Sequence, residues 1–119
     1  MNKILRYSFV ALLAMVFGNV MAEDTEVTFI FNTVEGLQEL GIAAPAASSQ
    51  TEFKNLSPAN QVTKGGVTMT TTDGASTTTR VFQSNDGKYT FRCYKNGGSF
   101  TFSLSDNTKK IKSIVFNVS

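Results

Sequence analysis

Residues 80–104 read RVFQSNDGKYTFRCYKNGGSFTFSL and contain three runs in which apolar and polar side chains alternate. Such alternation is typical of a β-strand that buries one of its two faces. Turn signals separate the runs at residues 84–87 and 96–97. Asn-Gly favours a two-residue hairpin turn, and Asn-Asp-Gly favours a three-residue turn that ends in a glycine bulge. We therefore expect three consecutive antiparallel strands in this stretch.

The first turn predicts which side chains share a face. A three-residue loop at 85–87 places Val81 opposite Phe91 on the core face. The same register places Arg80 opposite Arg92 on the other face, where an aromatic residue of each strand joins them. The resulting group, called the Arg/aromatic patch below, consists of Arg80, Phe82, Arg92 and Tyr94.

The second turn predicts a further hairpin. A two-residue turn at 96–97 places Cys93 opposite Phe100, with the other phenylalanines of both strands on the same face. A shift of the register by one residue would instead put those phenylalanines beside Arg92. We therefore expect the lone cysteine to be a buried apolar residue rather than an exposed thiol.

The Arg/aromatic patch has two interpretations. Directly opposed arginines repel each other, so an acidic neighbour, a bound anion, a packed layer or a ligand must offset the repulsion. A guanidinium group beside aromatic rings can stack on them and donate hydrogen bonds in a planar fork, an arrangement that suits sugars. Alternatively, the arginine stems and the rings simply cover the second face of the sheet beneath a loop or a further strand.

The remaining sequence predicts more strands and one short helix. Apolar residues recur at helical spacing in residues 34–40, and Gly41 is expected to end the helix. Residues 43–60 are rich in Ala, Ser and Pro and are expected to form a loop that Phe53 and Leu56 attach to the sheet. Strands are expected at residues 26–32, 67–72, 77–83, 88–95, 99–106 and 111–118, with a turn at 73–74 between the second and the third. This order favours an all-β, antiparallel sandwich with one short helix.

The N-terminal segment has the features of a signal peptide. Lys3 and Arg6 precede an apolar run at residues 7–17, which is shorter than the roughly 20 residues that a membrane-spanning helix needs. Small residues at 20–22 favour cleavage after Ala22. The expected domains are a signal peptide at 1–22 and a β-sandwich domain at 23–119. We expect a secreted, periplasmic or cell-surface protein that does not insert into the membrane after cleavage; the alternative is an N-terminal core helix.

Composition excludes several functional classes. The chain has no histidine and one cysteine, which rules out a Ser-His-Asp triad, histidine-ligated zinc and an internal disulfide. Without Lys3 and Arg6, nine basic residues balance nine acidic ones, so electrostatics give no reason to expect a nucleic-acid partner. Carboxylates occur in turns, at Asp73, Asp86 and Asp106, where backbone geometry favours them. We expect no enzyme, no cofactor and no metal centre, and leave open calcium binding at the turn aspartates.

Several short motifs together resemble one family. They are Arg80-Val81-Phe82, YTFRCYK at residues 89–95, FTF at 100–102, IKSIVF at 111–116 and Glu35-Gly36-Leu37. These motifs are similar to those of exported β-sandwich modules of Bacteroidetes, which are mostly uncharacterised jelly-roll-like domains at the front of surface proteins. The resemblance implies that further strands follow residues 111–118. The chain is therefore expected to be a fragment or a truncated product with an unpaired edge strand.

Export, a β-sandwich and the Arg/aromatic patch lead to one main hypothesis about function. The protein is expected to be a non-catalytic module of the cell surface that binds carbohydrate through Arg80, Phe82, Arg92 and Tyr94. The alternative is a structural or protein-interaction domain without a small-molecule ligand. In that case the same patch packs against a partner chain or against strands that this chain lacks.

Overall fold

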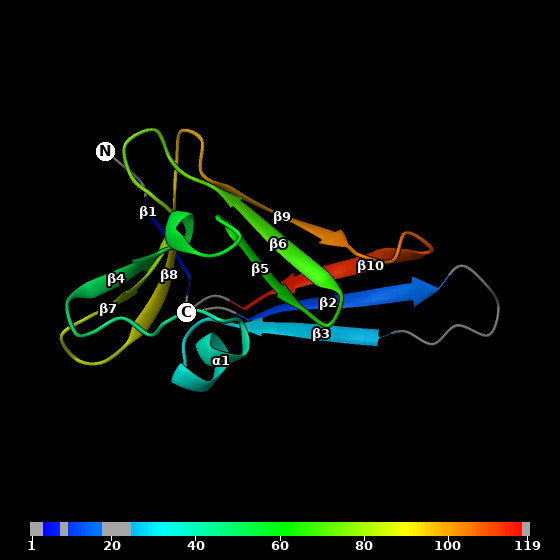
Figure 1. Ribbon diagram of the computed structural model, residues 1–119, viewed down its shortest axis with the longest axis horizontal. Helices are drawn as coiled ribbons and strands as arrows, with labels where there is room; N and C mark the ends of the chain where they lie inside the picture. The colour runs from blue at the N-terminus through cyan, green and yellow to red at the C-terminus, as the bar shows by residue number, and fades with distance from the viewer. Residues whose placement is uncertain (1–3, 8–9, 18–24, 118–119) are drawn as a thin grey trace.

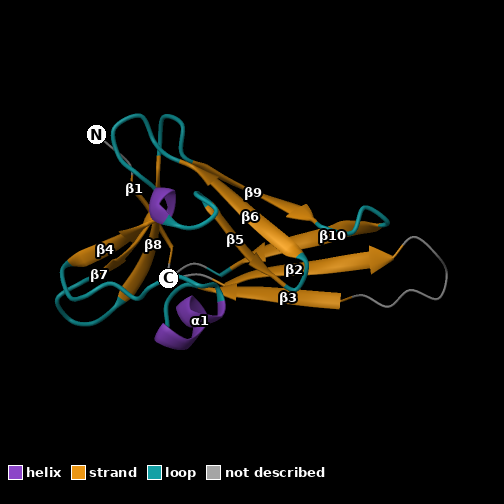
Figure 2. Ribbon diagram, in the orientation of Figure 1, coloured by secondary structure: helices purple, strands orange, loops and turns teal. Residues whose placement is uncertain are grey.

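The computed structural model describes residues 4–7, 10–17 and 25–117, and it describes side chains from residue 25 onward. In this part of the chain the fold is all-β and sandwich-like, as the sequence predicts, with a short helix at its lower edge (Figures 1 and 2). The elements are β1 (Ile4–Tyr7), β2 (Val10–Phe17), β3 (Thr25–Ile30), α1 (Val34–Glu39), β4 (Ser49–Glu52), the 3-10 turn η1 (Phe53–Asn55), β5 (Gln61–Lys64), β6 (Val67–Thr72), β7 (Arg80–Gln83), β8 (Tyr89–Tyr94), β9 (Ser99–Leu104) and β10 (Lys109–Phe116).

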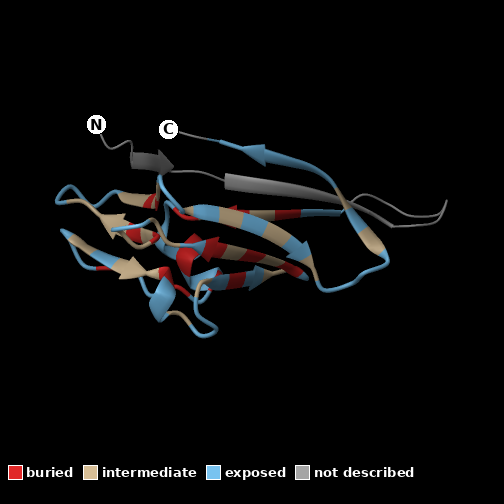
Figure 3. Cartoon of the chain, turned by 90° about the horizontal axis from the view of Figure 1, so that it is seen from above, coloured by how far each residue is buried: buried red, intermediate tan, exposed pale blue. Residues whose placement is uncertain are grey.

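The strands form three antiparallel sheets. One sheet has the order β1-β8-β7-β4, the second β10-β2-β3 and the third β5-β6-β9. In Figure 1 the first sheet lies on the left, while the second and third lie on the right, one across the other. Seen from above, the buried positions fall between the layers, and the C-terminal strand runs along the outside (Figure 3). The sheets therefore bury one face each against a common core.

Phenylalanine rings connect the sheets through that core. Phe91 of β8 is fully buried and contacts Phe31 and Phe53, with ring centroids 5.0 and 5.5 Å apart. Phe29 of β3 meets Phe102 of β9 edge-on at 5.9 Å. Tilted and edge-on ring pairs are the favourable arrangements, and burial of such large side chains contributes much of the stability of a small domain.

The predicted helix is confirmed, and it ends where the sequence predicts. Thr33 caps its N-terminus, because its hydroxyl oxygen accepts a hydrogen bond from the Gly36 amide at 3.0 Å. The apolar side of the helix faces the core, and Leu37 on that side is fully buried. Gly41 follows with a φ of +72°, the left-handed conformation that ends helices.

The predicted β7–β8 register is confirmed. Arg80 lies opposite Arg92, and Val81 lies opposite Phe91. The turn between the strands closes with a hydrogen bond from the Ser84 amide to the Lys88 carbonyl at 3.0 Å.

The predicted β8–β9 hairpin is wrong. Strand β8 pairs with β7 and β1, whereas β9 pairs with β6, so Phe102 lies opposite Met69 instead of Phe91. The φ angles of Asn96 and Gly97 are positive, at +64° and +119°, yet the chain crosses between two sheets at this point. The prediction of sidedness nevertheless holds, because Cys93 is only 1% exposed.

The turn predicted at 73–74 joins strands of two different sheets, and the strand predicted at 77–83 is shorter than expected. These strands are β6 and β7, and β7 begins only at Arg80. Before that strand, the Thr79 amide donates to the Asp73 carboxylate at 2.9 Å, and the Thr79 hydroxyl donates to the Thr72 carbonyl at 3.0 Å. These two hydrogen bonds, and not a strand ladder, fix the connection between the two sheets.

The stretch predicted as a loop at 43–60 contains β4 and η1. Strand β4 pairs with β7, which places Glu52 opposite Arg80. Phe53 is fully buried and Leu56 packs against the core, so the expected attachment of this stretch by these two residues is confirmed.

Two strands fall within the predicted signal peptide. Strand β1 pairs with β8, and β2 pairs with β3 on one side and β10 on the other. The cleavage site at Ala22 lies outside the described residues, and the domain boundaries at 1–22 and 23–119 stay a prediction. In the part of the chain that the structure describes, no helix is long and apolar enough to cross a membrane.

Candidate ligand-binding surface

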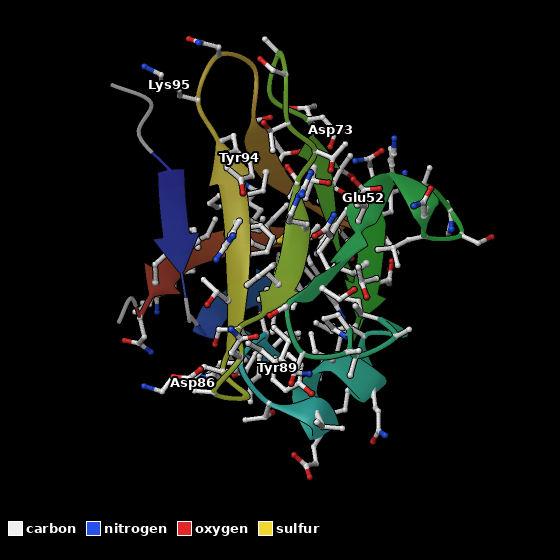
Figure 4. The ribbon with its side chains drawn as sticks, turned by 90° about the vertical axis from the view of Figure 1, so that its left-hand side faces the viewer. Glu52, Asp73, Asp86, Tyr89, Tyr94 and Lys95 are labelled. Carbon is white, nitrogen blue, oxygen red and sulfur yellow. The ribbon has the colours of Figure 1, made fainter. Side chains whose placement is uncertain are left out.

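The Arg/aromatic patch lies on the face of the first sheet that points away from the core. Its four residues lie on the neighbouring strands β7 and β8, and all four are partly buried. Figure 4 shows β8, β7 and β4 side by side, with Tyr94 on β8 and Glu52 on β4. The structure therefore brings together all the residues that the sequence assigns to the candidate site.

The two arginines stack on rings of the opposite strand. The Arg92 guanidinium carbon lies 4.0 Å from the centre of the Phe82 ring, and that of Arg80 lies 5.8 Å from the centre of the Tyr94 ring. Both distances allow attraction between the cation and the ring, and the shorter one is close stacking. The guanidinium group of each arginine thus lies over an aromatic ring of the neighbouring strand.

Arg80 has an acidic partner. Its Nη2 atom lies 3.3 Å from Glu52 Oε2 and donates a hydrogen bond to the Thr78 hydroxyl at 2.6 Å. Its Nε atom donates to the Thr78 carbonyl at 3.0 Å. Both the charge and the hydrogen-bonding capacity of this guanidinium are thus largely satisfied within the protein.

Glu52 is part of the same network. The Thr78 hydroxyl donates to Glu52 Oε2 at 2.6 Å, and this hydrogen bond is the main reason that the pKa of Glu52 is lowered. Partial burial of the carboxylate opposes the effect, and the charges of Lys54 and Arg80 add to it. Glu52 therefore stays ionised and offsets the repulsion between the opposed arginines.

Sequence reasoning missed Glu52 because it lies in the stretch interpreted as a loop. The strand SQTE contains no apolar residue, so it has no alternation that would indicate a strand. The sequence does indicate indirectly that an acidic residue lies nearby, because the repulsion between the opposed arginines has to be offset.

Arg92 is in a different electrostatic situation. Its Nε atom is buried without a hydrogen-bond partner. Among the residues that the structure describes, no carboxylate forms an ion pair with it. Arg92 as a whole is only partly buried, and a guanidinium group without an ion-pair partner can donate hydrogen bonds to an anion or to hydroxyl groups through its exposed atoms.

A loop borders the Tyr94 end of the patch. A β-carbon at Gly74 would lie 3.1 Å from the Tyr94 β-carbon, so only glycine leaves comfortable space there. The same loop contacts the turn after β8, because the Ala75 amide donates to the Asn96 carbonyl at 2.9 Å. Figure 4 shows Asp73 of this loop near the end of β8, where Tyr94 lies and Lys95 begins the next turn. The turn that follows Tyr94 is thus held against this loop.

The other chemically active groups have structural partners. Burial raises the pKa of the Cys93 thiol, which lies 4.0 Å from the Thr79 hydroxyl. The carboxylates of Asp86 and Asp106 accept hydrogen bonds within their own turns, from Ser84 and Thr108 respectively, and these bonds lower both pKa values. Within the described residues no group of three metal-ligating side chains occurs.

Comparisons with known protein families, with curated proteins and with solved structures find no match for this chain. The resemblance of its motifs to exported modules of Bacteroidetes therefore stays a prediction.

Proposed function

We propose that this protein is a non-catalytic module, exported to the periplasm or the cell surface, that binds carbohydrate through the Arg/aromatic patch. One observation carries the proposal: Arg92 stacks on Phe82 at 4.0 Å and lacks an acidic partner among the described residues, whereas Arg80 is paired with Glu52. The patch therefore combines two aromatic rings with one cation that no described carboxylate neutralises.

This combination matches the chemistry of sugars. The apolar faces of a pyranose ring stack on aromatic side chains, and its hydroxyl groups accept the directional hydrogen bonds of a guanidinium group. Phe82 and Tyr94 are partly exposed and lie on the same face. Because the positive charge of Arg92 has no ion-pair partner among the described residues, sugars that carry a carboxylate or a sulfate are favoured over neutral ones.

A glycan array followed by calorimetry on the acidic glycans that bind would test the proposal. Arg92→Met keeps the apolar stem over Phe82 but removes the charge and the donors, and it should weaken binding at least tenfold. Lys110→Met removes one positive charge from exposed β10 and serves as the matched control, with unchanged binding expected. Circular dichroism checks that both variants fold. Absence of binding to any glycan, or equal binding by both variants, would overturn the proposal.

A second candidate function is protein interaction without a small-molecule ligand. Ile114, Val115 and Phe116 at the end of β10 are 38%, 43% and 42% exposed. Three consecutive exposed apolar residues place apolar side chains on both faces of a strand, which is typical of an interaction surface. Sedimentation across a concentration series distinguishes the candidates, because a stable monomer that binds glycan would count against the second one.

A further inference from the structure

Strand β2 is the central strand of its sheet and lies inside the predicted signal peptide. Among the described strands, β3 and β10 each pair with β2 alone. Figure 1 shows β2 between them. The predicted cleavage after Ala22 would remove β2 and leave β3 and β10 two strand spacings apart, about 9–10 Å. The further inference rests on this predicted cleavage and not on carbohydrate binding.

The space that β2 occupies has an apolar floor. Phe29 of β3 and Phe116 of β10 both lie opposite Ala11 of β2. Phe102 of β9, in the sheet below, contacts both of these rings, at 5.9 Å from Phe29 and 6.4 Å from Phe116. Loss of β2 would therefore expose aromatic surface from two sheets along one groove.

The two flanking strands are poorly suited to close this groove by pairing with each other. Both run antiparallel to β2, so they run parallel to each other. Closure would require a shift of about 5 Å, the width of one strand. It would also separate Phe29 or Phe116 from Phe102. A register irregularity between Ile111 and Ser113 further prevents an even ladder along β10.

We propose that removal of the signal peptide opens an acceptor groove between β3 and β10 for an extended, uncharged apolar segment of another exported polypeptide. This segment runs antiparallel to both strands. Its main chain forms ladder hydrogen bonds on either side, and its alternate side chains cover Phe102, which is the general mode of strand addition.

The chemistry of this occupant follows from β2 itself. Its sequence VALLAMVF has eight residues and no charge, and it pairs along both walls of the acceptor groove. A second copy of the chain is disfavoured as the donor. Insertion of its β10 would need a two-fold axis perpendicular to the sheet, and both bodies would then occupy the same side of that sheet. A segment that extends from its own domain avoids this collision.

The experiment starts from the full chain, produced in a bacterium that exports and processes it. Mass spectrometry should find an N-terminus at Glu23. The probe is a labelled synthetic peptide, VALLAMVF with terminal lysines for solubility, and its binding is measured by fluorescence anisotropy. We expect one peptide per chain and a higher thermal midpoint on binding. A peptide with Leu13→Pro lacks a ladder donor at its centre and should bind at least tenfold more weakly.

A pair of protein variants localises the binding. Phe116→Ser removes a ring from the floor of the acceptor groove and should weaken peptide binding about tenfold, in line with the loss of an apolar contact of this size. Val34→Ser removes a comparably exposed apolar residue from α1, where it should leave binding unchanged. If the processed chain is unfolded alone, folding on addition of the peptide supports the proposal, and failure to fold overturns it.

Three further results would also overturn the proposal. The first is a processed protein in which the amides of β3 and β10 are protected from hydrogen exchange and the peptide does not bind. The second is a concentration-dependent dimer that excludes the peptide, which would assign the acceptor groove to a second copy. The third is an exported protein that retains residues 4–17.

Discussion

The turn after β7 and the turn after β8 differ in what they join. At residues 84–88 the chain returns to the neighbouring strand of the same sheet, whereas at 95–98 it crosses to another sheet. Both turns contain a glycine with positive φ, +86° at Gly87 and +119° at Gly97. A turn-forming backbone conformation is therefore not enough to make two strands pair.

The hydrogen bonds of the two turns explain the difference. In the first turn they are internal, since the Gly87 amide donates to the Ser84 carbonyl at 3.0 Å. In the second turn they come from elsewhere, since the Thr72 hydroxyl donates to the Gly97 carbonyl at 2.5 Å. Long-range contacts hold the second turn and direct β9 toward β6.

Strand β8 lies between the two turns in the chain, and the largest predicted effect comes from its core face. Phe91→Ala removes a fully buried ring that contacts Phe31, Phe53 and Phe100. We expect a loss of about 3–5 kcal/mol in the free energy of unfolding, which is enough to unfold a small domain. Urea denaturation monitored by circular dichroism measures it. A loss below about 1 kcal/mol would show that the core tolerates the cavity.

The second prediction compares one glycine of each turn. A β-carbon at Gly98 would overlap the Tyr94 carbonyl oxygen, whereas at Gly87 it would have no atom within 4 Å. Gly87→Ala should therefore lower the free energy of unfolding by only about 1–2 kcal/mol, the cost of an alanine in the left-handed conformation. Gly98→Ala should lower it further, because the backbone at residues 94 and 98 has to move apart to make room for the β-carbon. Urea denaturation of the two variants side by side provides the measurement. Equal losses would contradict the prediction that the backbone around Gly98 has no room for a β-carbon.

The contrast between the turns also explains what the sequence can predict. Strand positions and faces follow from side-chain alternation, which is a local property, so the burial of Cys93 and the β7–β8 register are predictable. The partner of β9 depends on β6, more than 25 residues earlier in the chain, and no local signal indicates that partner. The same holds for Glu52, because the strand that positions it has no apolar residue.

The third prediction concerns acid. The pKa of Glu52 is below its ordinary value of 4.5 in the folded protein, so its contribution to stability is complete above that pH and is lost as the pH falls through the lowered pKa. Glu52→Gln should therefore lose less stability than the native chain between about pH 5 and pH 3. Thermal unfolding across this pH range gives the measurement.

A charge-matched control accompanies the acid experiment. Glu35→Gln alters an exposed residue of α1 that has no ion pair among the described residues. It should follow the pH profile of the native chain. If Glu35→Gln and Glu52→Gln flatten the profile equally, the network of Thr78 and Arg80 does not have the role assigned to it.

The smallest predicted effect compares the two arginines of the patch. Arg80→Met removes the ion pair of Glu52 and leaves the Thr78 carbonyl without its donor, and it should destabilise the fold by about 1 kcal/mol. Arg92→Met removes a buried nitrogen without a partner and relieves repulsion, so its effect should lie within about 0.5 kcal/mol of zero. The double variant should lose more than the sum of the two single variants, because without Arg80 the Arg92→Met substitution no longer relieves any repulsion. A large loss of stability for Arg92→Met would show that Arg92 stabilises the sheet. Its guanidinium group would then have a structural role instead of the proposed role in binding a ligand.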